Sequence, residues 1–166
     1  MKNFKLLIAA ILIVGSVSAA QAQFFLPKNS NIGKPAPEFE TQTLLTKKKT
    51  SLSEFRGGKK AVIFFWATWC PHCREAFQEM DKDPGQFAKK DIKLILVDVE
   101  ETAKDVQVYV DKHKIALDVL LDQDGVISEK YDIIGVPTFF FVNQAGVIKD
   151  VQHELPDNYE QIFSQK

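Results

Sequence analysis

Two cysteines three residues apart have the types and spacing for redox chemistry. The segment reads Cys70-Pro71-His72-Cys73, and the 166-residue chain contains no other cysteine. Pro71 suits the first position of a helix, which makes Cys70 the N-cap residue. A sulfur at that position can accept hydrogen bonds from the first N–H groups of the helix, and the helix dipole adds positive partial charge. Both effects favour the thiolate, so we expect Cys70 to be the attacking nucleophile.

The rest of the motif supports the same role. Cys73 lies one helical turn after Cys70, on the same face, and is expected to resolve a mixed disulfide. His72 can donate a further hydrogen bond or carry charge near Cys70. Stabilising the reduced form in this way makes the disulfide more oxidising. The dipeptide Pro71-His72 is therefore expected to tune the redox potential.

Three other uses of the cysteine pair compete with redox exchange. A structural disulfide that closes so short a loop gains little chain-entropy stabilisation. A zinc site needs about four ligands, and the chain has only two cysteines and three histidines, at positions 72, 113 and 153. Paired thiolates suit Cu(I), although no further Cys or Met cluster accompanies them. We expect no metal and no cofactor, and keep a Cu(I) chaperone as the alternative of a different class.

A buried strand and a helix must hold the motif in place. Residues 61–66 form a continuous apolar run, which is typical of a strand buried on both faces. Residues 71–80 predict a helix, whose inner face comprises Cys73, Ala76, Phe77 and Met80. Further predicted elements are strands at 92–99, 117–121, 138–142 and 146–150, and helices at 103–113, 127–131 and 156–164. Strands that alternate with helices and end in a hairpin indicate an α/β layer with a mixed sheet.

Composition indicates one globular domain. The chain is 45% hydrophobic and 26% charged, with a formal net charge of −1. It lacks the basic footprint of a nucleic-acid binder, so we expect no nucleic-acid partner.

Residues 1–22 predict a secretory signal peptide. Lys2 and Lys5 precede an apolar run, and Ala20-Gln21-Ala22 has the small-x-small pattern of a cleavage site. The run is shorter than the ~20 residues that a membrane-spanning helix needs, which disfavours an uncleaved anchor. Either interpretation places the domain in the periplasm or otherwise outside the cytoplasm. Residues 23–38, with three prolines, predict an extended lead-in to a domain at 39–166.

The residues around the cysteines resemble a known family. Phe65-Trp-Ala-Thr-Trp-Cys-Pro-His-Cys73 resembles the active-site segment of the thioredoxin superfamily, most of all its extracytoplasmic TlpA/ResA-like branch. The same resemblance extends to residues 33–39 and 131–147. Residues 52–57 resemble the family's turn before the central strand. The resemblance implies a thioredoxin-like fold, with a mixed central sheet flanked by helices and an inserted helix and strand at 103–121.

The resemblance also implies a substrate-binding segment. Pro137 fits the family's cis-proline beside the reactive disulfide, which leaves the backbone of Val136 free to pair with an extended substrate. Trp69 is expected on an apolar rim that faces the substrate, and Trp66 in the core. The histidines at 113 and 153 are expected to be surface residues without a catalytic part.

Two positions depart from the family pattern. Phe64 stands where thioredoxins usually carry a buried Asp, and Ala76 stands where the TlpA/ResA branch often has a Glu. The neighbouring Glu75 points away from the face of Cys73 by its helical phase. We therefore expect no carboxylate to manage the proton of Cys73, which leaves water or His72.

The sequence predicts an extracytoplasmic thiol–disulfide oxidoreductase that acts on protein cysteine pairs. A redox partner, expected in the membrane, would regenerate the dithiol. The branch match slightly favours a reductase, whereas Pro-His, the dipeptide of DsbA, favours an oxidant or isomerase. A peroxiredoxin is disfavoured because Ala67 and Ile63 stand where its motif has Thr or Ser and Pro.

Overall fold

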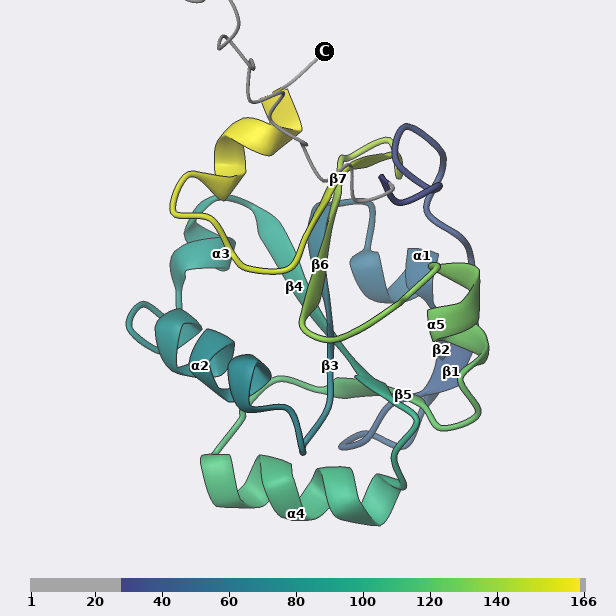
Figure 1. Ribbon diagram of the computed structural model, residues 1–166, viewed down its shortest axis with the longest axis vertical. Coiled ribbons are helices and arrows are strands. Elements are labelled where there is room, and N and C mark those ends of the chain that lie inside the picture. The colour runs from purple at the N-terminus through teal and green to yellow at the C-terminus, as the bar shows by residue number, and fades with distance from the viewer. Residues whose placement is uncertain (1–27, 165–166) are drawn as a thin grey trace, which may run out of the picture.

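The computed structural model describes residues 28–164 as a sheet between two layers of helices (Figure 1). The predicted signal peptide and the start of the lead-in lie outside the described residues. None of the helices within residues 28–164 has the length and apolar character needed to cross a membrane.

A five-stranded mixed sheet forms the centre of the fold. Its strand order is β5-β4-β3-β6-β7. Strands β3, β4 and β5 are parallel to one another, β6 is antiparallel to β3, and β7 is antiparallel to β6. The strands are β3 (Lys60–Trp66), β4 (Ile92–Val99), β5 (Val119–Asp122), β6 (Thr138–Val142) and β7 (Ile148–Gln152). Helix α4 (Ala103–His113) and β5 lie between β4 and β6 in the chain, as expected for the inserted helix and strand.

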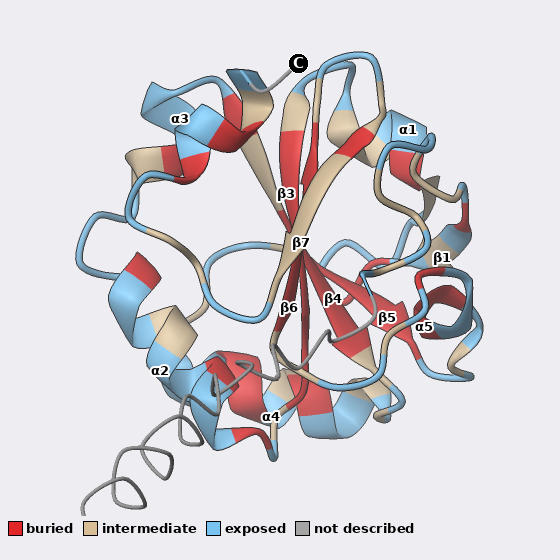
Figure 2. Cartoon of the chain, turned by 45° about the horizontal axis from the view of Figure 1, so that its top comes forward, coloured by how far each residue is buried: buried red, intermediate tan, exposed pale blue. Residues whose placement is uncertain are grey.

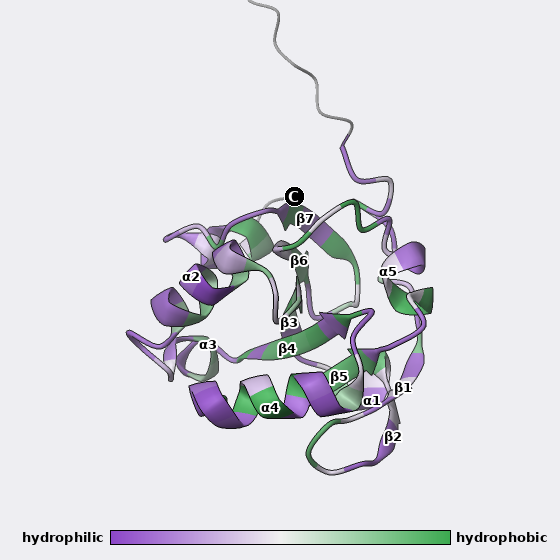
Figure 3. Ribbon diagram, turned by 60° about the horizontal axis from the view of Figure 1, so that its bottom comes forward, coloured by the Kyte–Doolittle hydropathy of each residue, from purple (hydrophilic) through white to green (hydrophobic). Residues whose placement is uncertain are grey.

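Helices cover both faces of the sheet, which explains the unbroken apolar run of β3. One hydrophobic core contains Phe64 and Trp66 together with residues of α2 (Pro71–Met80), α3 (Gln86–Lys89) and α4. The other contains Ile63 and Phe65 together with residues of α1 (Leu52–Arg56) and α5 (Val126–Lys130). The buried strands occupy the middle of Figure 2, surrounded by exposed helix faces. Figure 3 shows α4 with hydrophilic ends and hydrophobic residues between them.

The described part of the lead-in contacts the edge of the sheet. Residues 30–33 form a turn rather than the predicted extended chain. At the end of that turn, Gly33 N donates to Ile148 O at 2.8 Å and Ile148 N donates to Lys34 O at 2.9 Å. A two-stranded antiparallel sheet follows, formed by β1 (Glu40–Gln42) and β2 (Lys49–Ser51).

Four predicted elements need correction. The strand expected at 117–121 is β5, which starts at Val119 and ends at Asp122. The turn expected at 52–57 is the helix α1, because Ser51 and Glu54 form a capping box that starts it. The last strand starts at Ile148 rather than 146, since Gly146 has a left-handed φ of 84° within the preceding turn. The helix expected at 156–164 is a shorter 3-10 helix, η1 (Tyr159–Ser164). A hydrogen bond from Tyr159 N to Pro156 O closes the turn that precedes it.

Candidate active site

Cys70 and Cys73 form a disulfide at the N-terminus of α2, with their Cα atoms 5.3 Å apart. Cys70 has the extended backbone of an N-cap residue, and Pro71 follows as the first helical residue. The N–H of Cys73 donates to Cys70 Sγ at 3.1 Å. The sulfur thus takes the place of a capping oxygen and receives a backbone donor that stabilises negative charge.

His72 lies beside the disulfide but contacts a carboxylate. Its Nδ1 is 2.9 Å from Glu75 Oε2, one turn along α2, and both side chains are largely exposed. The positive charge of a protonated His72 is therefore offset by Glu75.

Residues 135–138 fold against the disulfide. The peptide bond between Val136 and Pro137 is cis, and Cys70 Sγ lies 3.5 Å from the Val136 carbonyl oxygen. The hydroxyl of Thr138 donates to Gly135 O at 2.7 Å and holds the segment together. The structure thus places the backbone of Val136 next to Cys70 Sγ.

The two tryptophans occupy opposite environments. Trp69, next to Cys70, is 69% exposed, whereas Trp66 is fully buried. Trp66 packs edge-on against Phe77 with ring centroids 4.9 Å apart. Trp69 thus presents its ring to solvent next to Cys70, and Trp66 belongs to the buried core.

A glutamate that the sequence reasoning missed anchors the loop between β3 and α2. The backbone N–H and the hydroxyl of Thr68 both donate to the Glu101 carboxylate at 2.5 Å. Glu101 follows β4, the parallel neighbour of β3. Because the carboxyl ends of parallel strands share one edge of a sheet, an acidic residue after β4 was a usable signal.

A buried carboxyl group lies near this anchor. Asp98, at the end of β4, is the cross-strand partner of Trp66 and is fully buried. Its carboxylate oxygens have no hydrogen-bond partner among the described residues. Burial raises the pKa of Asp98 to about 9, and the negative charge of Glu101 adds to the effect. Asp98 is thus a buried carboxyl group on the strand beside β3. The expectation that no carboxylate manages the proton of Cys73 stays a prediction.

A groove of about 650 Å³ lies beside the disulfide helix. Ala76 and three polar residues of α2 form one wall. The segment before Thr138 and the loop after β7 form the other. The lining residues are His72, Glu75, Ala76, Glu79, Ile134, Gly135, Val136, Pro137, His153, Glu154 and Leu155.

His153 is an exposed surface residue, as expected, and it lines this groove. Its Nδ1 is 3.1 Å from Pro137 O and 3.2 Å from Thr138 Oγ1. The other expected surface histidine, His113, packs its ring against Tyr109 on α4, with centroids 4.2 Å apart.

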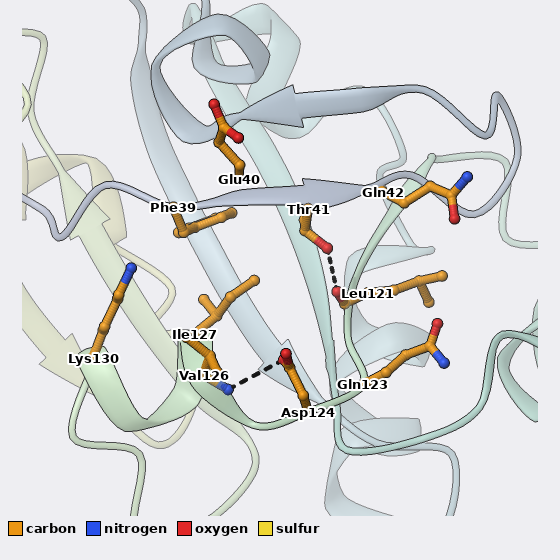
Figure 4. A pocket seen from close by; sticks show the side chains of 10 residues that line it. All are labelled: Phe39, Glu40, Thr41, Gln42, Leu121, Gln123, Asp124, Val126, Ile127 and Lys130. Atoms are coloured by element: carbon orange, nitrogen blue, oxygen red, sulfur yellow. Dashed lines mark hydrogen bonds between the residues drawn. The ribbon is translucent and has the colours of Figure 1, made fainter.

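A smaller pocket of about 280 Å³ lies between β1, β5 and α5 (Figure 4). None of its lining residues belongs to the disulfide loop or to segment 135–138. Within residues 28–164, no three His, Cys, Asp or Glu side chains gather as possible ligands of a metal ion.

Comparison with known proteins decides the family. The model of the AhpC/TSA family matches residues 32–151. This chain belongs to the AhpC/TSA family. It is similar to the thioredoxin-like protein YneN of Bacillus subtilis, with 31% identity over 87% of this chain and 85% of that protein. It is also similar to the thiol-disulfide oxidoreductase ResA of Bacillus thuringiensis, with 31% identity over 93% of this chain and 91% of ResA.

Solved structures show the same fold. The thioredoxin domain of a thiol-disulfide oxidoreductase from Bacteroides vulgatus superimposes with a TM-score of 0.69 at 24% identity, covering 80% of this chain and 96% of that one. StoA from Bacillus subtilis gives a TM-score of 0.63 at 21% identity, covering 78% and 98%. The predicted thioredoxin-like fold is confirmed, and within the AhpC/TSA family this chain is a ResA-like thiol–disulfide oxidoreductase.

The surroundings of Cys70 lack two residues of the peroxiredoxin motif. Ala67 and Ile63 occupy the positions of the peroxiredoxin Thr or Ser and Pro, and both are fully buried. Neither offers a hydroxyl group to a bound peroxide.

Proposed function

We propose that this protein exchanges disulfides with cysteine pairs of protein substrates, in the reductive direction and outside the cytoplasm. The observation that carries the proposal is the position of Cys70 Sγ at the N-terminus of α2, where it accepts the N–H of Cys73 at 3.1 Å. That donor and the helix dipole favour the thiolate, which is the nucleophile of disulfide exchange.

The reaction runs in two exchanges. In the reduced protein the Cys70 thiolate attacks one sulfur of a substrate disulfide, forming a mixed disulfide and releasing the other substrate sulfur as a thiolate. Cys73 then loses its proton and attacks Cys70 Sγ. This step forms the Cys70–Cys73 disulfide and releases the second substrate thiolate. Two electrons pass to the substrate, whose thiolates take up protons from water.

Residues around the sulfurs hold the substrate. An extended segment that pairs with the backbone of Val136 comes within reach of Cys70 Sγ, which is 3.5 Å from the Val136 carbonyl oxygen. Pro137 lines the groove on that side, and the exposed ring of Trp69 offers an apolar surface next to Cys70. Pro71 and His72 tune the potential.

The pairing of His72 with Glu75 supports the reductive direction. An unpaired cation near Cys70 would stabilise the thiolate and make the disulfide a stronger oxidant. The Glu75 carboxylate, 2.9 Å from His72 Nδ1, offsets that charge.

The proposal includes a location and a partner. The signal peptide predicted at residues 1–22 supports export. A reductase outside the cytoplasm must have its dithiol regenerated, so a second redox protein, expected in the membrane, returns two electrons and two protons in each cycle.

The first test is the redox equilibrium of the pair in a glutathione series, read by tryptophan fluorescence. We expect a potential nearer that of thioredoxin, about −270 mV, than that of DsbA, about −120 mV. A potential near the DsbA value would instead make the protein an oxidant or isomerase. A pair that stays oxidised in excess dithiothreitol until the protein unfolds would leave only a structural disulfide.

Cysteine variants test the assigned roles. Cys73→Ser should accumulate a mixed disulfide through Cys70, whereas Cys70→Ser should trap none. A reduced protein that exchanges no disulfides but holds one Cu(I) against a mild chelator would establish the copper chaperone instead.

A further inference from the structure

His153 contacts the segment that faces the reactive sulfur, although it lies 16 residues further along the chain. Its Nδ1 is 3.1 Å from the Pro137 carbonyl oxygen. The same nitrogen is 3.2 Å from Thr138 Oγ1. The imidazole comes from the loop after β7 and is exposed, so its contacts with this segment do not belong to the core.

These two contacts determine which ring nitrogen carries the proton. A carbonyl oxygen can only accept a hydrogen bond. Thr138 already donates its hydroxyl proton to Gly135 O at 2.7 Å, so its oxygen offers lone pairs to the histidine. Nδ1 must therefore be protonated and donate to both oxygens. In the neutral ring, Nε2 is left without a proton.

The hydrogen bond to Pro137 reaches Cys70 through one peptide unit. The Val136 carbonyl precedes Pro137 and lies 3.5 Å from Cys70 Sγ. A donor that holds the Pro137 carbonyl thereby limits rotation of the backbone on which an extended substrate would pair. His153 is also one of the residues that line the groove beside α2.

We propose that His153 is a positioning residue for substrate binding, whose Nδ1–H holds the backbone of Val136 and Pro137 beside Cys70. This inference rests on the proposed function, because it assigns the segment to the substrate. His153 takes no part in bond making. Its loss should weaken the binding of an extended substrate and leave the reactivity of the sulfur unchanged.

The protonation state is tested directly by nitrogen NMR of protein labelled with ¹⁵N-histidine, at a pH where the ring is neutral. We expect a protonated Nδ1 and a bare Nε2 both for His72, whose Nδ1 faces the Glu75 carboxylate, and for His153. Only the His153 signals should vanish in His153→Asn. A proton on Nε2 of His153 would overturn the proposal, whatever the activity of the protein.

Kinetics separate positioning from reactivity. Two substrates are compared with the reduced protein, a disulfide-linked extended peptide and the small aromatic disulfide DTNB, which does not need the groove. With His153→Ala we expect the KM for the peptide to rise about fivefold, the loss that one neutral hydrogen bond corresponds to, with kcat within about twofold. The rate with DTNB should not change.

Two variants complete the test. His153→Asn places an amide N–H near the position of Nδ1 and should restore most of the peptide KM. His113→Ala, on α4, should match the wild type. An equal loss with both substrates, or an Asn variant no better than Ala, would overturn the inference. A wild-type protein that reduces neither substrate would refute the proposed function itself.

Discussion

At the scale of single residues, we expect Glu75 to limit the effect of His72 on Cys70. The carboxylate pairs with the imidazole at 2.9 Å, so Glu75→Gln removes a negative charge from the neighbourhood of the thiolate. The reduced state becomes more favourable and the potential should rise. Because an exposed ion pair contributes less than about 1 kcal/mol, we expect the reduction potential to rise by about 10 mV. The glutathione equilibrium measures it.

Glu79→Gln is the matched control. Glu79 lies one turn further along α2 and pairs with Lys82 instead of His72. Its replacement should shift the potential by less than that of Glu75. A fall in the potential of the Glu75 variant, or equal shifts in both variants, would contradict this account.

Single residues were predictable from sequence where local rules apply. The N-cap position of Cys70 follows from Pro71 and from the strand–helix boundary alone. The pairing of His72 with Glu75 instead depends on a rotamer choice between two neighbours. The contact between His153 and Pro137 joins two loops, and nothing local signals it.

At the scale of elements, folding buries the Asp98 carboxyl group at the end of β4 and disfavours its charged form. Burial raises the pKa of Asp98 from its ordinary value of 3.8 to about 9. The folded state therefore binds this proton more tightly than the unfolded state. The stability this provides is fully present below about pH 4 and is lost as pH rises towards 9, by at most about 1.4 kcal/mol per pH unit.

Asp98→Asn removes this titration. We expect the variant to gain stability relative to the wild type as pH increases, with a larger difference at pH 8 than at pH 5. Unfolding in urea of both oxidised proteins measures the difference. An equal difference in unfolding free energy at the two pH values would refute the raised pKa of Asp98.

Asp122→Asn is a contrasting control at the end of β5. The Asp122 carboxylate accepts the N–H groups of Ile127 at 2.8 Å and Ser128 at 2.7 Å. This replacement should destabilise the protein at both pH values, since it removes an acceptor from buried donors.

Elements were predictable to the extent that their pattern is local. The apolar run of β3 and the inner face of α2 were recognised because both are long and periodic. Helix α1 was missed because five residues give too little periodicity, although Ser51 and Glu54 carry its capping signal. The raised pKa of Asp98 could not be predicted, because the apolar pattern of a strand does not indicate the protonation state of an acid within it.

At the scale of the molecule, the groove beside the disulfide is acidic. Its lining includes three carboxylates, Glu75, Glu79 and Glu154, and no lysine or arginine. We expect peptide disulfides flanked by lysine to react roughly threefold faster than those flanked by glutamate at low salt. The preference should fade as salt shortens the range of the field.

Glu154→Gln should reduce this preference, because the Glu154 carboxylate has no ion-pair or hydrogen-bond partner among residues 28–164. Asp124→Asn changes the same charge in the pocket of Figure 4 and should leave the preference intact. Rates measured in a salt series with both peptides provide the test. A preference for the acidic peptide would be the contrary result.

The overall topology was predictable because strand–helix alternation and the active-site segment agree on one fold. The groove was not, since its walls come from α2, segment 134–137 and residues 153–155. Such a surface exists only once the chain has folded.

The contrast between the two tryptophans gives the protein two separate optical reporters. A water-soluble quencher such as iodide should reach the exposed Trp69 beside Cys70. It should not reach Trp66, which is fully buried and packs against Phe77. A bound substrate that shields Trp69 would lower the quenchable share of the emission, and unfolding would raise it. Quenching can therefore distinguish an occupied active site from a lost fold in a single titration.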